Sequence, residues 1–320
     1  MLPALAVAVA FGSFAFAEDQ ADSAKTTTKI ETVKPATEKN KPASGTDADE
    51  IITNKKMRAE SGSKSKWSIG TALAYNGGTL ETPLNEKRPD LTGSPGQTLN
   101  ASFGGNVGVG YKASTTDRYS LDVGVRWIAP LQKNAPQGYK GDRVDASNPS
   151  ITYSKIGRIG SLQSQFSAGP TLYTQTNQRR IGGYQYGATI LENMNYEVGK
   201  SGFSVGLYTE LDGNTFDKNT PEAKDNSADV SFQMVPYMEY VLNDTFNLRT
   251  VFNYNIYDHV RSSDAWTFTK ATNQQSVGLG ISVTRDIFLY PNIQFQPKDI
   301  THIFRADTTN VAISSNINVF

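Results

Sequence analysis

The feature that most constrains this chain is a stretch of two-residue alternation that runs from Thr98 to Ile128. Apart from Gly105, apolar or aromatic side chains occupy every second position from Leu99 to Tyr111, and the alternation resumes after a short turn at 113–117. Because successive side chains of a β-strand point to opposite faces, the stretch predicts two antiparallel strands with one apolar and one polar face each. These strands are longer than those of most soluble β-proteins.

The polar face of this stretch is rich in Gly, Ser, Thr and Asn, and aromatic residues lie near the strand ends, as at Tyr111, Tyr119 and Trp127. This combination is typical of transmembrane β-barrel strands, which are apolar toward lipid and polar toward the lumen. The mean hydropathy of −0.44 argues against a helical membrane protein. Beyond the first 17 residues, the sequence has no apolar run long enough for a spanning helix.

Composition narrows the range of partners and cofactors. The formal net charge is +0, which gives no electrostatic reason to expect a nucleic-acid partner. The 320 residues include no cysteine, so disulfides and thiolate metal sites are excluded. The acidic residues of the loops match no known cation-loop spacing, and we expect neither a metal nor a cofactor.

The N-terminal region predicts two segments ahead of the barrel. Residues 1–17 form an apolar run that ends in Ala15-Phe16-Ala17, a small-x-small cleavage site typical of a signal peptide; the alternative is a buried helix. Residues 18–66 hold nine acidic and ten basic residues and no aromatic, so we expect a disordered periplasmic arm. A solvated tether is the favoured interpretation of this arm, and a plug inside the barrel is the alternative.

From Trp67 onward, long and short connections alternate, which sets the number of strands. Long loops outside and short turns in the periplasm are typical of outer-membrane barrels. With both chain ends on the periplasmic side, this parity predicts a single antiparallel β-barrel over 67–320 with about twelve strands, near 67–76, 98–112, 118–129, 149–156, 161–174, 184–198, 202–212, 229–241, 246–257, 272–284, 287–297 and 310–320.

The final residue, Phe320, follows the alternating stretch 310–320. Here the chain resembles the porin-like outer-membrane β-barrel proteins of Gram-negative bacteria, whose last strand ends in an aromatic residue that the barrel-insertion machinery recognises. Phe320 departs from their usual pattern, because it lies out of phase with the apolar residues of its strand. The resemblance implies an outer-membrane location, contact with outer-membrane lipid and a homo-oligomer. Some porin-like proteins of predatory bacteria are thought to enclose lipid within a ring of barrels.

The alternation also assigns side chains to the two faces of the predicted barrel. The bulky or charged lumen-lining residues are Asp122, Arg126, Tyr208, Glu210, Tyr237, Glu239 and Arg249. Their charge is mixed and slightly acidic, which is consistent either with a weakly cation-preferring constriction or with an ion-pair network that stiffens the wall. The aromatics expected at the membrane interfaces are Trp67, Tyr75, Tyr111, Tyr119, Trp127 and Tyr240.

Four residues on the predicted lipid face are unusual there: Pro170, Pro236, Pro291 and Glu192. Proline donates no ladder hydrogen bond, and a carboxylate is unfavourable in hydrocarbon. Local bulges and an interfacial depth for Glu192 would explain them. The alternative is that this part of the wall faces another subunit.

The leading functional prediction is a porin-like channel for passive diffusion of small polar solutes. The alternative is a structural homo-oligomer that packs around or encloses lipid without conducting. An outer-membrane phospholipase is a third hypothesis, since such an enzyme needs a Ser–His pair and the sequence offers His259 near Ser262 and Ser263. His259 lies in no lipase-type motif, so we expect a protein that is not an enzyme.

Overall fold

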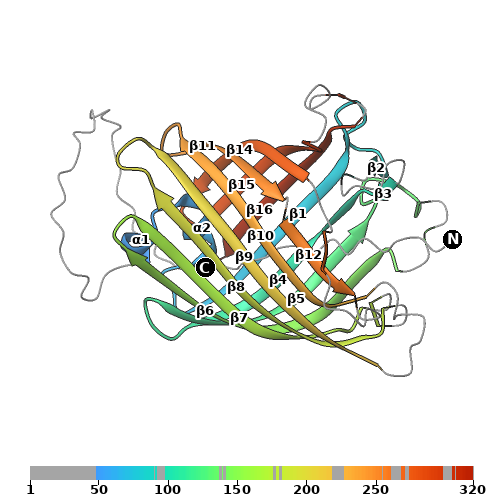
Figure 1. The fold of residues 1–320 in the computed structure, drawn as a ribbon, viewed down its shortest axis with the longest axis horizontal. Coiled ribbons are helices and arrows are strands. Elements are labelled where there is room, and N and C mark those ends of the chain that lie inside the picture. The colour runs from blue at the N-terminus through green and yellow to red at the C-terminus, as the bar shows by residue number, and fades with distance from the viewer. Residues whose placement is uncertain are drawn as a thin grey trace.

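In the computed structural model, twelve antiparallel strands close into one barrel (Figure 1). The structure describes residues 48–319 except 90, 92–97, 137–138, 140–141, 176–177, 180–181, 218–226, 254, 261–267, 271–273, 298–304 and 307. The predicted signal peptide, residues 18–47 of the predicted arm and the predicted insertion signal at Phe320 therefore lie outside the described residues. Within the described part, no helix is both long enough and apolar enough to cross a membrane.

The strands of the wall lie close to the predicted ranges. They are β1 (Trp67–Thr79), β4 (Ser102–Lys112), β5 (Asp117–Ile128), β6 (Val144–Ile159), β7 (Leu162–Leu172), β8 (Tyr184–Glu197), β9 (Phe203–Phe216), β10 (Ala228–Val241), β11 (Phe246–Asn253) with its continuation β12 (Asn255–Val260), β14 (Gln274–Thr284), β15 (Ile287–Phe295) and β16 (Asn310–Val319). Three short strands belong to the long-loop end: β2 (Lys87–Pro89), β3 (Thr98–Asn100) and β13 (Phe268–Lys270).

The barrel is closed because its first and last strands pair with each other. β1 pairs with β16 on one side and with β4 on the other, and β10 pairs with both parts of the β11/β12 strand. Every strand of the wall thus has two neighbours, which leaves no unpaired sheet edge. The predicted all-β barrel is confirmed.

Burial distinguishes the two faces of the wall. On β5, Asp122 is 1% exposed, whereas its neighbours Leu121 and Val123 are 56% and 36% exposed. The polar side chain therefore points into the barrel and the apolar ones point out. The same pattern recurs on β7, where Gln163 and Gln165 are buried inside.

The wall departs from regular pairing at one of the prolines on its outer face. β10 pairs with β12 through Met234↔Asn255 and with β11 through Tyr237↔Val251, so the register shifts by one residue between these pairs. Pro236 lies between the two pairings, where a residue without a backbone N–H is tolerated. The expected bulge is present at this proline, whereas Pro170 and Pro291 lie in pairings without a register shift, opposite Ala188 and Ile313.

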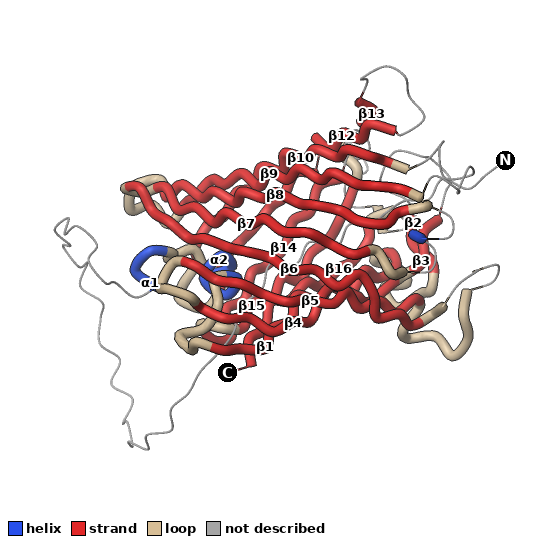
Figure 2. The backbone as a smooth tube through the Cα atoms, turned by 90° about the horizontal axis from the view of Figure 1, so that it is seen from below, coloured by secondary structure: helices blue, strands red, loops and turns tan. Residues whose placement is uncertain are grey.

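The two ends of the barrel differ. Long connections and the small β2–β3 sheet lie at one end, and tight turns lie at the other, where α1 (Ala48–Ile51) and α2 (Lys55–Glu60) are also found (Figures 1 and 2). Residues 48–66 are packed against the inner face of the wall here, with Ile52, Met57, Ala59 and Ser63 almost fully buried. For residues 48–66, the expectation of a disordered, solvated arm is corrected in favour of a folded segment.

Candidate functional site

Residues 48–66, hereafter the mouth segment, lie inside the short-turn end of the barrel. Ala48 of α1 and Ile52, the residue after it, pack against Ile156 of β6, and Met57 of α2 completes this apolar cluster. Ala59 of α2 packs against Phe288 and Tyr290 of β15. The mouth segment is therefore seated by apolar contacts at both of its helices.

The mouth segment spans the full width of the barrel. On one side, the backbone amides of Thr53 and Asn54 donate to Oε1 of Gln163 on β7, at 2.8 and 2.9 Å. On the other side, Ala59 contacts β15. Five of the twelve wall strands separate β7 from β15 in either direction around the ring, so these contacts fall on opposite walls.

Asn54 starts the longer helix and also ties it to the wall. Its side chain accepts from the backbone N–H of Met57 at 3.1 Å, which is the usual arrangement at a helix N-cap. Its Nδ2 donates to Oε2 of Glu239 on β10 at 2.8 Å. An isolated helix of 6 residues would be unstable in water, so α2 depends on such contacts for its structure.

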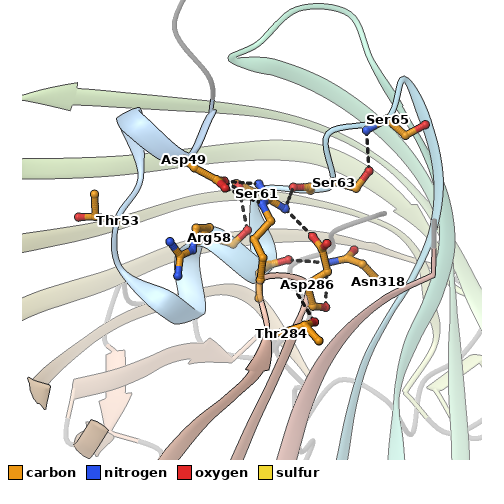
Figure 3. Close-up of polar contacts among 12 residues, drawn as sticks. Asp49, Thr53, Arg58, Ser61, Ser63, Ser65, Thr284, Asp286 and Asn318 are labelled. Atoms are coloured by element: carbon orange, nitrogen blue, oxygen red, sulfur yellow. Dashed lines mark hydrogen bonds and ion pairs between the residues drawn. The ribbon is translucent and has the colours of Figure 1, made fainter. Parts of the chain in front are cut away.

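A single arginine in the β14–β15 turn holds both ends of the mouth segment. Arg285 Nε donates to both carboxylate oxygens of Asp49, at 2.8 and 3.0 Å, and Nη2 lies 2.6 Å from Oδ1 of the same group. Arg285 Nη1 donates to the carbonyl of Gly62 and to Asp286. Figure 3 shows Asp49 of α1 facing Asp286 of the turn across these bonds. We call the contacts of Arg285 with Asp49 and Gly62 the clasp.

The clasp is charged and only partly screened by solvent. The side chains of Arg285 and Asp49 are 17% and 24% exposed. Burial by itself disfavours the arginine charge, but the hydrogen bonds and charges of Asp49 and Asp286 outweigh it and raise the pKa of Arg285. Bidentate arginine–carboxylate pairs of this kind are among the stronger polar contacts in proteins.

Further polar contacts distribute the attachment around the ring. Thr53 Oγ1 donates to Glu197 of β8, and Arg158 of β6 pairs with the same carboxylate at 2.7 Å. On the other side, Lys112 of β4 donates to the carbonyl of Ser63, and Asn318 Nδ2 of β16 donates to the carbonyl of Ala59 at 3.0 Å. Asn318 is labelled beside the turn in Figure 3.

Three of the predicted lumen-lining residues meet next to the mouth segment. Glu239 pairs with Arg249 of β11 on the inner face, and both side chains are buried. The guanidinium of Arg249 lies 4.3 Å from the ring centre of Tyr237, and the Tyr237 hydroxyl donates to Asn193 Oδ1 at 3.0 Å. The ion-pair interpretation of these lumen charges is thus consistent with this part of the wall.

The other predicted lumen-lining residues lie further along the wall. On β9, the Tyr208 hydroxyl donates to Glu210, which also accepts from Gln233 Nε2 at 2.8 Å. Asp122 accepts from Ser120 within β5 at 2.7 Å. Arg126 is aligned with Asp145 of β6 in the strand register. The structure therefore divides the predicted set between the mouth and two other parts of the wall, on β9 and β5.

The acidic side of the inner wall extends beyond Glu210. Asp212 lies on the same face of β9 and accepts from Thr189 of β8 at 2.5 Å. Ser231 of β10 is aligned with both Asp212 and Asp258 of β12. Sequence reasoning did not single out Asp258, although alternation from Ser231 would place it on this face.

The predicted interface aromatics point outward near strand ends. Trp67, Tyr119, Trp127 and Tyr240 are all more than 40% exposed, and Trp67 packs on Tyr111 with ring centres 4.9 Å apart. The hydroxyl of Tyr75 donates to the carbonyl of Pro83 in the loop after β1, at 3.1 Å. Their position relative to a bilayer stays a prediction.

Glu192 lies on the outer face, as the alternation predicts, and its carboxylate accepts a hydrogen bond from another outward-facing side chain. Ser164 Oγ of β7 donates to Glu192 Oε1 at 2.6 Å. Thr209 of β9 is aligned with Glu192 and donates to its carbonyl at 3.4 Å. These three residues form a small polar patch between exposed Ile190 and partly exposed Met194.

His259, the residue behind the phospholipase hypothesis, contacts a carboxylate. Its Nδ1 lies 2.6 Å from Oδ1 of Asp229, and its ring packs on Phe268. Ser262 and Ser263 lie outside the described residues, so the proposed Ser–His pair is not described.

Sequence reasoning did not identify Arg285 or assign contacts to the mouth segment. The available signal was weak: Ile51, Ile52 and Met57 are the only large apolar residues between 48 and 66, and they occur close together. The partners of the segment are distributed over most of the barrel, which no local pattern can reveal.

Comparisons with known proteins do not assign this chain to a family. No family model matches, and no curated protein matches. Among solved structures, the match to the NanC porin covers 79% of this chain and 100% of the porin chain, with 8% identity and a TM-score of 0.42. The COG4313 outer membrane channel from Pseudomonas putida F1 covers 79% and 95%, with 9% identity and a TM-score of 0.44.

The KdgM porin is similar to the same extent, with 79% and 99% coverage, 9% identity and a TM-score of 0.40. TM-scores in this range carry no functional argument. The barrel fold of this chain rests on its own strand pairings.

Proposed function

We propose that this chain is an outer-membrane channel for passive diffusion of small polar solutes. The observation that carries the proposal is the opposite character of the two faces of a closed twelve-strand wall, as in Asp122 at 1% and Leu121 at 56% exposure. Such a wall satisfies its backbone hydrogen bonds without water and offers apolar side chains to lipid. Its polar inner face suits dissolved solutes and not a lipid tail.

The N-terminal sequence and the outer face of the wall support a location in the outer membrane. The apolar run that ends in a small-x-small site at Ala15–Ala17 supports export, and the apolar outer face of the wall supports insertion into the outer membrane of a Gram-negative bacterium. The tight turns and the mouth segment then face the periplasm, because short turns lie on that side in barrels of this class.

The inner wall favours cations weakly. Glu210 and Asp212 of β9 project inward side by side, and Asp258 is aligned with the same serine as Asp212. Carboxylates that line a pore raise the local concentration of cations and lower that of anions.

The test is conductance of the purified full-length protein in planar bilayers. Current steps with a cation-to-anion permeability ratio above one are expected. Silence from protein that shows β-sheet circular dichroism and resists detergent at low temperature would contradict a channel, even after removal of residues 48–62.

A second function is supported by one observation, the Glu192–Ser164 bond on the outer face. A carboxylate at this position is better satisfied against another protein surface than against lipid tails. A structural homo-oligomer that packs around lipid would place such a patch between subunits. Mass measurement of detergent-purified particles tests it: a stable ring that retains lipid and gives no current would favour this function over the channel.

A further inference from the structure

We infer that the mouth segment is a releasable plug, and that Arg285 is the residue that holds it in the barrel. This inference rests on the proposed channel function and adds a closed state to it. Four observations carry it: the span of the segment, the independence of the wall, the polar character of the seat, and the position of the clasp.

The mouth segment obstructs the lumen because it reaches from one wall of the barrel to the opposite wall. The segment is attached at Gln163 on β7 and at Phe288 and Tyr290 on β15, which are opposite strands of the ring. Helices that cross the mouth from wall to wall stand directly in the path of a solute.

The wall does not need the segment for closure. Strand β1 pairs with β16 over Ile69–Asn76 and with β4 over Trp67–Asn76, and the β4 pairing extends only one residue into the mouth segment, where the carbonyl of Lys66 accepts from the backbone N–H of Lys112 at 2.8 Å. Its two helices, α1 and α2, precede β1 and are joined to it through residues 61–66. Departure of the helices therefore leaves the strand pairings of the barrel intact.

The wall residues that bind the mouth segment, here called the seat, are polar and can be hydrated once the segment has left. The wall groups that bind it are an amide at Gln163, carboxylates at Glu197 and Glu239, and the ammonium of Lys112. Asn195 of β8 is 1% exposed in the seated state, with neither side-chain amide atom bonded to protein. Release returns these groups to solvent, which offsets part of the cost of breaking the contacts.

The clasp determines the equilibrium between the docked and the released mouth segment. The apolar contacts of the segment come from a few side chains, namely Ala48, Ile51, Ile52, Met57 and Ala59. Arg285 binds Asp49 before α2 and Gly62 after it, so one side chain fixes both ends of the segment. Because Arg285 lies in a two-residue turn at the rim, its contacts with Asp49 and Gly62 can break without disturbing the strands.

Thiol labelling tests release directly, since the chain has no cysteine of its own. In full-length protein carrying Met57→Cys, position 57 is 1% exposed, and a water-soluble maleimide should react slowly. Adding Arg285→Ala should raise the labelling rate about tenfold, the ratio that corresponds to loss of a charge-assisted hydrogen bond. Lys200→Ala is the matched control, since it removes a cation from the exposed β8–β9 turn, and it should leave the rate unchanged.

Conductance tests the consequence of release. Arg285→Ala should raise the open probability by a similar factor. A disulfide between Ala59→Cys and Asn318→Cys, placed where the Asn318 side chain bonds the Ala59 carbonyl, should hold the pore closed until reductant is added.

Equal labelling of Met57→Cys with and without Arg285→Ala would overturn the clasp. Free conduction by the oxidised disulfide variant would overturn the plug. Accelerated labelling in protein that never conducts, even with residues 48–62 removed, would uphold the release of the segment and overturn the channel instead.

Discussion

Arg285 and Asp49 lie 236 residues apart in the chain and share two hydrogen bonds of 2.8 and 3.0 Å in the structure. One residue belongs to a tight turn of the wall and the other to a helix that precedes the first strand. Their contact joins the mouth segment, which its local sequence predicts to be solvated, to a turn whose local sequence predicts no partner.

The first prediction concerns the coupling of these two residues. Asp49→Asn and Arg285→Ala remove the same ion pair, so their effects on the labelling rate of Met57→Cys should not add. Thr53→Val removes a contact on the opposite wall, at Glu197, and should add to either change. A double-mutant cycle measures both. Full additivity of Asp49→Asn with Arg285→Ala would contradict the assigned pair.

The second prediction concerns the buried ion pair of Glu239 and Arg249. Arg249→Met leaves the Glu239 carboxylate buried without its cation, and we expect a loss of about 3–5 kcal/mol in the free energy of unfolding. Urea unfolding in lipid vesicles, followed by tryptophan fluorescence, measures it. Glu239→Gln combined with Arg249→Met should recover part of the loss.

The control for the ion pair is Lys155→Met. Lys155 lies 3.9 Å from Asp117 on the outer face and is 59% exposed. Exposed pairs contribute little, so this change should leave the unfolding curve almost unmoved. A loss as large as that of Arg249→Met would show that the assay reports charge removal in general.

The third prediction concerns ion selectivity. Glu210→Gln with Asp212→Asn removes two carboxylates from the inner wall and should lower the cation-to-anion permeability ratio toward one. Glu192→Gln removes a carboxylate from the outer face and should leave the ratio unchanged. Reversal potentials in a salt gradient measure both variants. An equal effect of the outer change would contradict the inward placement of the acidic wall.

The fourth prediction concerns two glycines of the wall. An added Cβ at Gly105 would lie 1.9 Å from the Ala72 carbonyl oxygen, and the φ of +145° is one that other residues rarely adopt. We expect Gly105→Ala to cost about 1–3 kcal/mol in the free energy of unfolding. Gly157 meets nothing within 4 Å, so Gly157→Ala should cost less than about 0.5 kcal/mol. Unfolding in urea compares the two.

Sequence alternation was sufficient for most of the barrel because each wall strand separates a polar face from an apolar one. It failed where the backbone departs from two-residue periodicity. β6 begins at Val144 and not near 149, because Asn148 has a φ of +53° and the register with β5 shifts between Asp122 and Gly124. Alternation on both sides of such a bulge is out of phase, so the first part of the strand was assigned to a loop.

The faces of individual side chains were predictable, but their partners were not. Glu239 and Arg249 both follow from alternation as inward residues, whereas their pairing depends on the register between β10 and β11. The mouth segment was the least predictable part. Its composition alone favours disorder, and its structure depends on contacts with distant residues, such as Gln163, 109 positions from Asn54, and Asn318, 259 positions from Ala59.

The closing of β1 on β16 also sets an order of events during biogenesis. Asp49 and Ala59 precede β1, whereas Arg285 and Asn318 lie in the β14–β15 turn and in β16. Contacts that close loops of this length form late, because their entropic cost must be met by structure already in place. A docked mouth segment would therefore be found only in barrels that have finished assembling. Protease resistance of residues 48–66 would then measure the fraction of fully assembled barrels.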